Sequence, residues 1–95
     1  MVYVRDRLRT IVPVFLRTSA QGLADMREAL ARGDLEVVRR GGHSLKGSAA
    51  TMGVAAVEIL GRDIEQAAQD GGRERLEDLL AELADCLDRL DIRFR

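Results

Sequence analysis

The only histidine of the chain, His43, is followed three residues later by Lys46 and four residues later by Gly47. Positions three and four apart share one face of a helix, so the imidazole would have a cation beside it and no side chain above it. A cation about 4 Å from a phosphoryl oxygen contributes roughly 1–4 kcal/mol at surface-like dielectrics. This spacing favours an accessible nitrogen nucleophile that accepts a phosphoryl group and later releases it.

The helix expected around His43 has an apolar face that spans Leu35 to Met52, and His43 lies roughly 130° from the centre of that face. Five residues on its side of the helix, or at the edge of that side, are cationic or small: Arg39, Arg40, Lys46, Gly47 and Ala50. A glycine inside a helix costs about 1 kcal/mol relative to alanine, and clearance over the imidazole is the simplest reason for Gly47. The position of His43 alone leaves an ordinary solvated histidine open as the alternative.

Length and composition restrict the class of protein. The 95 residues are enough for one domain with a single core, expected over residues 1–95. A net charge of −1 argues against a general nucleic-acid-binding surface. No apolar run approaches the ~20 residues of a membrane span and no signal peptide is present, so a cytoplasmic location is expected. With one histidine and one cysteine, no metal site is expected, and Cys86 is expected to be a small buried residue of the last helix.

Apolar residues recur at helical spacing in four segments. The first segment begins near Pro13, a residue suited to the first turn of a helix, and ends at Gly33. The second segment follows Asp34, a good N-cap, and continues to Gly53. Its apolar face consists of residues at alternating spacings of three and four: Leu35, Val38, Gly42, Leu45, Ala49 and Met52.

The third segment covers about residues 54–69, and the fourth carries leucines from Leu76 to Leu90. Residues 2–12 are rich in β-branched side chains and are expected to be either extended or a short helix. No segment alternates between apolar and polar residues for long enough to predict a strand. The sequence therefore predicts an all-α fold, an antiparallel four-helix bundle with a short N-terminal lead-in.

The block His43-Ser44-Leu45-Lys46-Gly47 resembles the signature of histidine-containing phosphotransfer (HPt) domains, the helical shuttles of phosphorelays. The phosphoryl-acceptor domain of chemotaxis kinases is similar at the same block. The similarity to HPt domains also includes four flanking stretches, at residues 13–16, 29–34, 39–40 and 64–68. The resemblance implies that His43 carries the phosphoryl group, Lys46 neutralises its charge, Gly47 provides clearance and Glu65 orients the ring.

Glu65 follows Ile64 of its apolar stripe as His43 follows Gly42 of its own, so both side chains could lie at one edge of the contact between their helices. A carboxylate bound to Nδ1–H would fix the tautomer and leave Nε2 as the free nucleophile. The alternative is an exposed Glu65 paired with Arg62, an interaction worth little. The residues alone leave both interpretations open, and the resemblance favours the ring contact.

The resemblance implies a phosphorelay intermediate that takes the group from a receiver-domain aspartyl phosphate onto His43 and passes it to another receiver. The chain has no glycine-rich phosphate loop, so no kinase activity and no cofactor of its own are expected, and Mg²⁺ is expected only on the partner receiver. The expected partners are response-regulator receiver domains, with a hybrid histidine kinase as a further candidate, and the chain is expected to be a monomer. The residues expected to contact a partner are Arg39, Arg40, Ala50 and Arg62.

Two other functions are alternatives to this one. The dimerisation and phosphoacceptor region of a histidine kinase is phosphorylated directly from ATP, but it usually has an acidic residue right after the histidine, where this chain has Ser44. A bundle that docks receivers without being phosphorylated would not need the spacing of His43, Lys46 and Gly47. An obligate dimer on size-exclusion chromatography would favour the kinase region.

Gly41 and Gly42 depart from the HPt pattern, which usually has side chains at both positions. Each glycine inside a helix costs roughly 0.5–1 kcal/mol relative to alanine. Replacing both by alanine is therefore expected to raise the free energy of unfolding by about 1–2 kcal/mol, if the helix is regular there. A loss of stability would instead mean that one of the glycines is needed for close helix packing.

Overall fold

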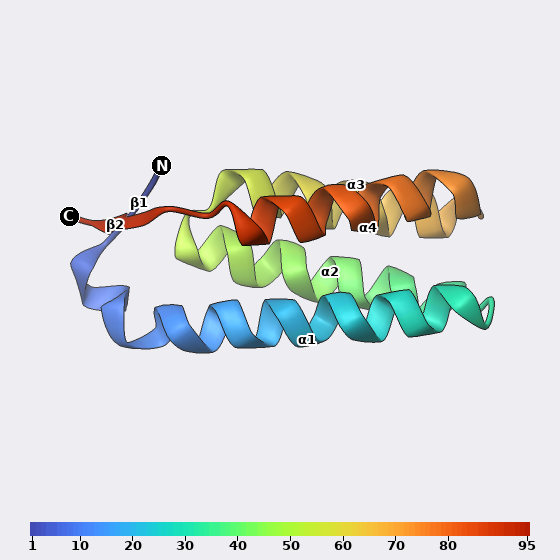
Figure 1. Ribbon diagram of the computed structural model, residues 1–95, viewed down its shortest axis with the longest axis horizontal. Coiled ribbons are helices and arrows are strands. Elements are labelled where there is room, and N and C mark those ends of the chain that lie inside the picture. The colour runs from blue at the N-terminus through green and yellow to red at the C-terminus, as the bar shows by residue number, and fades with distance from the viewer.

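A computed structural model describes residues 1–95 and shows four helices packed along a bundle about 40 Å long (Figure 1). The helices are α1 (Val12–Ala31), α2 (Leu35–Met52), α3 (Ala55–Gln69) and α4 (Arg73–Asp88). Successive helices run in opposite directions because only short turns join them (Figure 1). The predicted four-helix bundle is confirmed. None of the helices combines the length and the apolar character that crossing a membrane requires.

Local signals in the sequence set the helix ends. Pro13 lies in the first turn of α1, where its missing N–H leaves no hydrogen bond unmade. The Asp34 carboxylate caps α2 by accepting a hydrogen bond from the Val37 N–H at 3.3 Å. Gly33 and Gly53 follow α1 and α2 with φ angles of 77° and 75°, a left-handed conformation that glycine adopts without steric cost. The predicted ends of these two helices agree closely with the structure.

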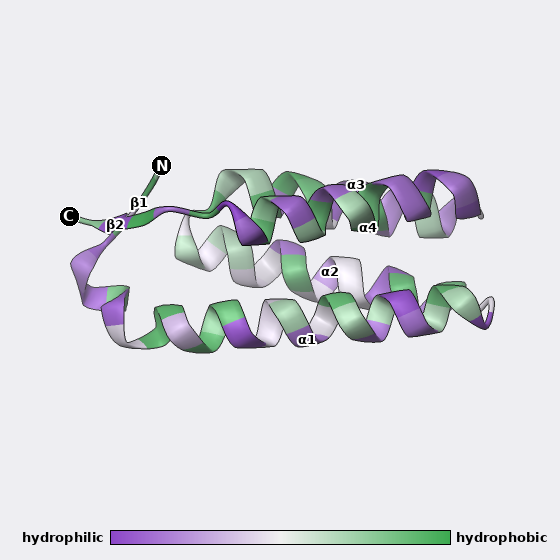
Figure 2. Cartoon of the chain, viewed as in Figure 1, coloured by the Kyte–Doolittle hydropathy of each residue, from purple (hydrophilic) through white to green (hydrophobic).

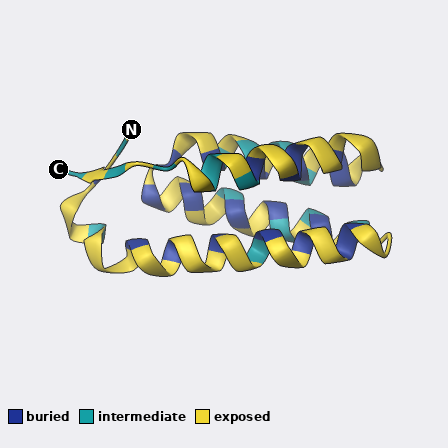
Figure 3. Ribbon diagram, viewed as in Figure 1, coloured by how far each residue is buried: buried dark blue, intermediate teal, exposed yellow.

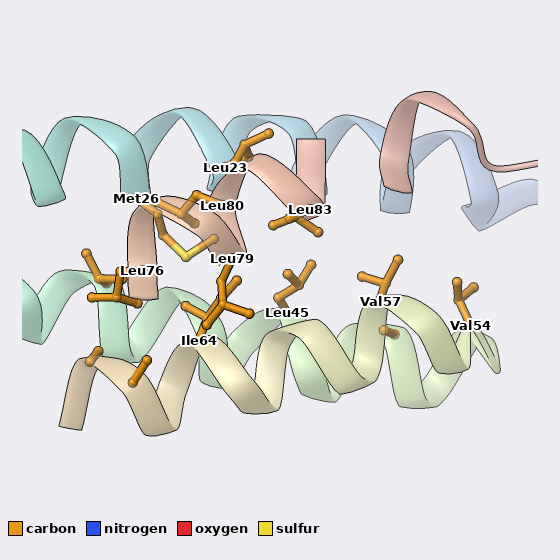
Figure 4. Packing of buried hydrophobic residues seen from close by; sticks show 14 of the residues in the cluster. Leu23, Met26, Leu45, Val54, Val57, Ile64, Leu76, Leu79, Leu80 and Leu83 are labelled. Carbon is orange, nitrogen blue, oxygen red and sulfur yellow. The ribbon is translucent and has the colours of Figure 1, made fainter. Parts of the chain in front are cut away.

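The buried apolar residues form one core cluster. Figure 3 shows that all four helices contribute buried residues. Each helix is amphipathic, with apolar and hydrophilic residues in alternating patches along its length (Figure 2). The side chains that meet in the middle of the cluster come from all four helices (Figure 4): Met26, Leu45, Ile64, Leu79 and Leu80. The apolar stripes predicted from helical spacing therefore form the core.

The last turn of α4 packs less tightly than the sequence predicts. Leu87 and Leu90 are only partly buried, and the helix ends at Asp88. Cys86 is partly buried against the core as well, and burial raises the pKa of its thiol. This environment keeps the thiol protonated and agrees with the packing role expected for Cys86.

The two ends of the chain pair with each other at one end of the bundle (Figure 1). β1 (Val2–Val4) lies parallel to β2 (Ile92–Phe94), and η1 (Asp6–Ile11) is a 3₁₀ helix that leads into α1. Three residue pairs face each other across the strands: Val2–Ile92, Tyr3–Arg93 and Val4–Phe94. The sequence does not predict these strands, because each has three residues and its partner lies at the opposite end of the chain. The lead-in segment, expected to be extended or helical, contains both structures.

Candidate functional site

The backbones of α2 and α3 come close together at two glycines, Gly42 and Gly61. A Cβ on Gly42 would lie 2.8 Å from the Gly61 carbonyl oxygen and 2.8 Å from the Glu65 amide nitrogen, and a Cβ on Gly61 would lie 2.7 Å from the Lys46 amide nitrogen. Real Cβ atoms are essentially never found this close to backbone atoms. The two backbones can therefore touch only because both positions lack a side chain.

This contact corrects the expectation that alanine would stabilise the turn before His43. Gly42 is buried against the backbone of α3, so a methyl group there has no space. Gly41 is also tightly packed, since its Cβ would lie 2.7 Å from Cγ of the buried Met26. The predicted gain in stability from alanine at Gly41 and Gly42 is therefore wrong, and the alternative of close helix packing describes the structure.

The close approach of α2 and α3 brings three of the predicted site residues together across the helix contact: His43, Lys46 and Glu65. His43 Nδ1 lies 2.9 Å from Glu65 Oε2, and Lys46 Nζ donates a hydrogen bond to Glu65 Oε1 at 2.8 Å. One carboxylate therefore holds both the imidazole and the ammonium group, one on each oxygen. The ring contact predicted for Glu65 is present, and the alternative pairing with Arg62 is not, because Arg62 lies beside Asp63 at 3.8 Å.

One edge of the imidazole is held by Glu65, and the rest of the ring is largely exposed to solvent. The His43 side chain is 65% exposed, whereas the Glu65 side chain is only 18% exposed. In neutral histidine the contact with the carboxylate places the proton on Nδ1, which leaves the Nε2 lone pair free. A Cβ on Gly47, one helical turn away, would meet no atom within 4 Å, so the space beside the ring is open. This arrangement is suited to attack by Nε2 on a group that arrives from solvent.

The positive charges around Glu65 keep it ionised. The hydrogen bond from the Lys46 ammonium is the main reason why the pKa of Glu65 lies below its ordinary value of 4.5. The hydrogen bond from the His43 ring lowers this pKa further, while partial burial opposes both effects. An Arg39 guanidinium nitrogen lies 4.0 Å from Glu65 Oε2 and adds to the positive surroundings.

The lowered pKa of Glu65 predicts a specific dependence of stability on pH. A carboxyl group whose folded-state pKa is depressed stabilises the fold above its unfolded-state pKa, and this contribution is lost as pH falls through the folded-state value. The difference in free energy of unfolding between the parent and Glu65→Gln is therefore expected to shrink below about pH 4.5. Urea unfolding of both proteins between pH 3 and 7 measures this difference. A difference that grows on acidification would contradict the assigned ion pairs.

The remaining residues predicted to contact a partner are exposed to different degrees. Arg39 is engaged, since its guanidinium donates two hydrogen bonds to the Glu36 carboxylate at 2.9 and 2.6 Å. Arg40 and Arg62 are more exposed and have carboxylates only at 3.8 Å. Ala50 is exposed two turns beyond His43. The side of α2 around His43 therefore has fewer free cations than its sequence indicates.

An apolar hollow between α1 and α2 was not identified from the sequence. Ile11 and Val14 are large apolar residues that remain 42% and 44% exposed. They line a hollow of about 370 Å³ together with Ser48 and Thr51, which lie one to two turns beyond His43 on α2. The signal that the sequence offers is the presence of two large apolar residues, Ile11 and Val14, close to Pro13 at the start of the first helix.

The structure therefore displays a histidine on the surface of a helical bundle, with Nδ1 held by a carboxylate and the rest of the ring largely exposed. The family model described as Hpt domain matches residues 10–92. The chain therefore belongs to the Hpt domain family, and its role is histidine phosphotransfer in a phosphorelay. No curated protein and no solved structure matched the chain.

Proposed function

We propose that His43 Nε2 attacks the phosphorus of an aspartyl phosphate on a receiver domain. A P–N bond forms, the P–O bond to the aspartate breaks, and the aspartate leaves as a carboxylate. The ring then carries a positive charge with its proton still on Nδ1, where Glu65 compensates the charge. Attack by a second receiver's aspartate reverses these steps. The observation that carries this proposal is the 2.9 Å contact between His43 Nδ1 and Glu65, with the ring otherwise open to solvent.

Lys46 has a double role in this proposal. Its ammonium group has three N–H donors, and Glu65 Oε1 accepts one of them. The remaining donors are available to phosphoryl oxygens on the neighbouring ring. We assign the ATP-dependent step to a kinase and the Mg²⁺ ion to the receiver, so this domain contributes positioning and charge but no cofactor.

The transfer is tested with a receiver labelled on its aspartate in the absence of ATP. Label is expected to move to this chain and then to a second, unlabelled receiver. Lys46→Ala is expected to slow both steps by about tenfold, equivalent to about 1.4 kcal/mol, with an unchanged circular dichroism spectrum. Labelling by ATP and a kinase catalytic domain, but never by a receiver, would instead support the phosphoacceptor region of a histidine kinase.

Clearance at Gly47 is proposed to let the receiver reach the ring. Gly47→Leu is expected to weaken receiver binding by about tenfold, because the leucine would cover the imidazole. Gly47→Ala is the matched control, since a methyl group meets no atom within 4 Å and leaves the ring open. Isothermal titration calorimetry with the same receiver compares the two variants. Equal affinities for the leucine and alanine variants would exclude clearance as the role of Gly47.

A further inference from the structure

The paired ends of the chain form an arginine-rich cap on the bundle. We define this terminal cap as residues 1–11 and 89–95, which contain six arginines and two aspartates and have a formal charge of +4. The remaining residues, 12–88, have a formal charge of −5. The Hpt match covers residues 10–92, so five of the six arginines lie outside the part that the family explains: Arg5, Arg7, Arg9, Arg93 and Arg95.

The terminal cap is an ordered part of the fold. Val4 is only 1% exposed and belongs to the core cluster. The Asp6 N–H donates to the Arg95 carbonyl at 2.8 Å, and the Arg95 N–H donates to the Val4 carbonyl at 3.1 Å. The Arg9 guanidinium stacks 4.1 Å from the centre of the Phe94 ring. Because the backbone is fixed, the cap presents its charges without a large ordering cost on binding.

Three arginines of the terminal cap have no ion pair within the chain. Arg9 is paired with Asp6, Arg93 with Asp91, and Arg89 with Asp85. The three arginines without an ion pair all line one hollow of about 350 Å³: Arg5, Arg7 and Arg95. The Arg95 guanidinium lies over the Tyr3 ring, 5.5 Å from its centre. Tyr3 lines the same hollow, and the hydrophilic 3₁₀ helix that carries Arg7 is visible in Figure 2. These groups remain available to an external anion or carboxylate.

This hollow is continuous with the side of α2 that carries His43. Ala50 and Thr51 line it together with the arginines. Ala50 is seven residues after His43, so it lies on the same side of the helix and roughly 10 Å further along. A transient interface covers about 600 Å² on each partner, which corresponds to a patch roughly 28 Å across. A protein centred on His43 would therefore also cover the hollow.

We propose that Arg5, Arg7 and Arg95 form a docking surface for an acidic patch on the receiver that exchanges its phosphoryl group with His43. This inference rests on the proposed function. The charge distribution favours an acidic partner at this place, because the terminal cap attracts it and the acidic remainder of the bundle repels it elsewhere. The acidic α4 of a second copy is the competing occupant. The receiver is favoured because the hollow adjoins the side of α2 on which the reactive ring is displayed.

The test compares two double variants that remove the same charge from opposite ends of the bundle. Arg5→Gln with Arg7→Gln removes two charges from the cap, and Arg27→Gln with Arg75→Gln removes two at the far end, beside the hollows that adjoin Ala31 and Asp70. The probe is a purified receiver domain selected because it binds the parent chain in calorimetry. Transfer from its phosphorylated form is followed by rapid quench at about 0.02 M and 0.5 M salt, where screening differs strongly.

The second-order rate constant of the cap variant is expected to fall about five- to tenfold at low salt, and the loss is expected to vanish at high salt. The far-end variant should stay within about twofold of the parent under both conditions. The rate at saturating receiver should be unchanged, because neither variant alters His43. Equal losses in both variants, or no loss in the cap variant, would overturn the inference. So would reduced self-association of the cap variant in sedimentation with unchanged receiver transfer, which would assign the surface to a second copy.

Phosphoramidate, a small phosphoryl donor that needs no docking, separates this inference from the proposed function. It is expected to load His43 equally in the parent and in both variants. A receiver that binds in a cap-dependent way but transfers no phosphoryl group would overturn the proposed function and support the docking surface. A receiver that transfers to the parent and to the cap variant at the same rate would overturn the docking surface and support the proposed function.

Discussion

Gly42→Ala is expected to lower the free energy of unfolding by about 1–3 kcal/mol, the usual cost of forcing an extra group into a packed contact. The new methyl group would lie 2.8 Å from two backbone atoms of α3, and neither can move without separating the helices. This loss is expected even though alanine has a better helix propensity than glycine by about 1 kcal/mol. Urea denaturation of the variant and the parent measures the difference.

The matched control makes the same substitution five residues later in the same helix. Gly47→Ala meets no atom within 4 Å, so only the helix propensity changes and stability is expected to rise by about 0.5–1 kcal/mol. Opposite signs for the two variants would identify close packing as the role of Gly42. If Gly42→Ala stabilises the fold as Gly47→Ala does, the contact with Gly61 does not limit the distance between α2 and α3.

His43→Gln is expected to abolish phosphoryl acceptance and leave the fold intact. The imidazole is 65% exposed and lies outside the core, so the substitution should change stability by no more than about 0.5 kcal/mol. Glu65 would keep its hydrogen bond from Lys46, and the chain has no second histidine. Incubation with a labelled receiver, followed by acid treatment, measures the acid-labile label on each protein. An acid-labile label on the variant would place the acceptor at another residue.

The sequence predicts the parts of this fold that depend on local spacing. A helix buries residues three and four apart, and its ends are marked by residues such as Asp34 and Gly53. The buried face and the ends of each helix can therefore be predicted from the residues of that helix alone. The spacing also allows the contact between His43 and Glu65, because each follows the apolar stripe of its helix by one residue, and the resemblance to HPt domains favours this contact over a pairing of Glu65 with Arg62. The helix pattern depends on the geometry of a single helix, and the contact between His43 and Glu65 depends on the packing of two adjacent helices.

The features that the sequence did not predict depend on how distant segments meet. The sequence does not tell whether Gly42 weakens its helix or allows another helix to pack closely against it. The structure decides this, because Gly42 lies against Gly61 of α3. The terminal strands pair residues about 90 positions apart, and three residues are too few for an alternating pattern. The hydrogen bond from Lys46 to Glu65 depends on how α2 and α3 are aligned along each other. The sequence does not give this alignment, so it does not predict Glu65 as a partner of Lys46.

The decisive observation for the proposed transfer is which ring nitrogen of His43 becomes phosphorylated. The chain is labelled with ¹⁵N, incubated with a phosphorylated receiver, and studied by long-range ¹H–¹⁵N and ³¹P NMR of its single histidine. Phosphorus is expected to be attached to Nε2 of His43, and Nδ1 is expected to retain its proton beside Glu65. An unmodified His43 after transfer, or phosphorus attached to Nδ1, would contradict the proposed transfer.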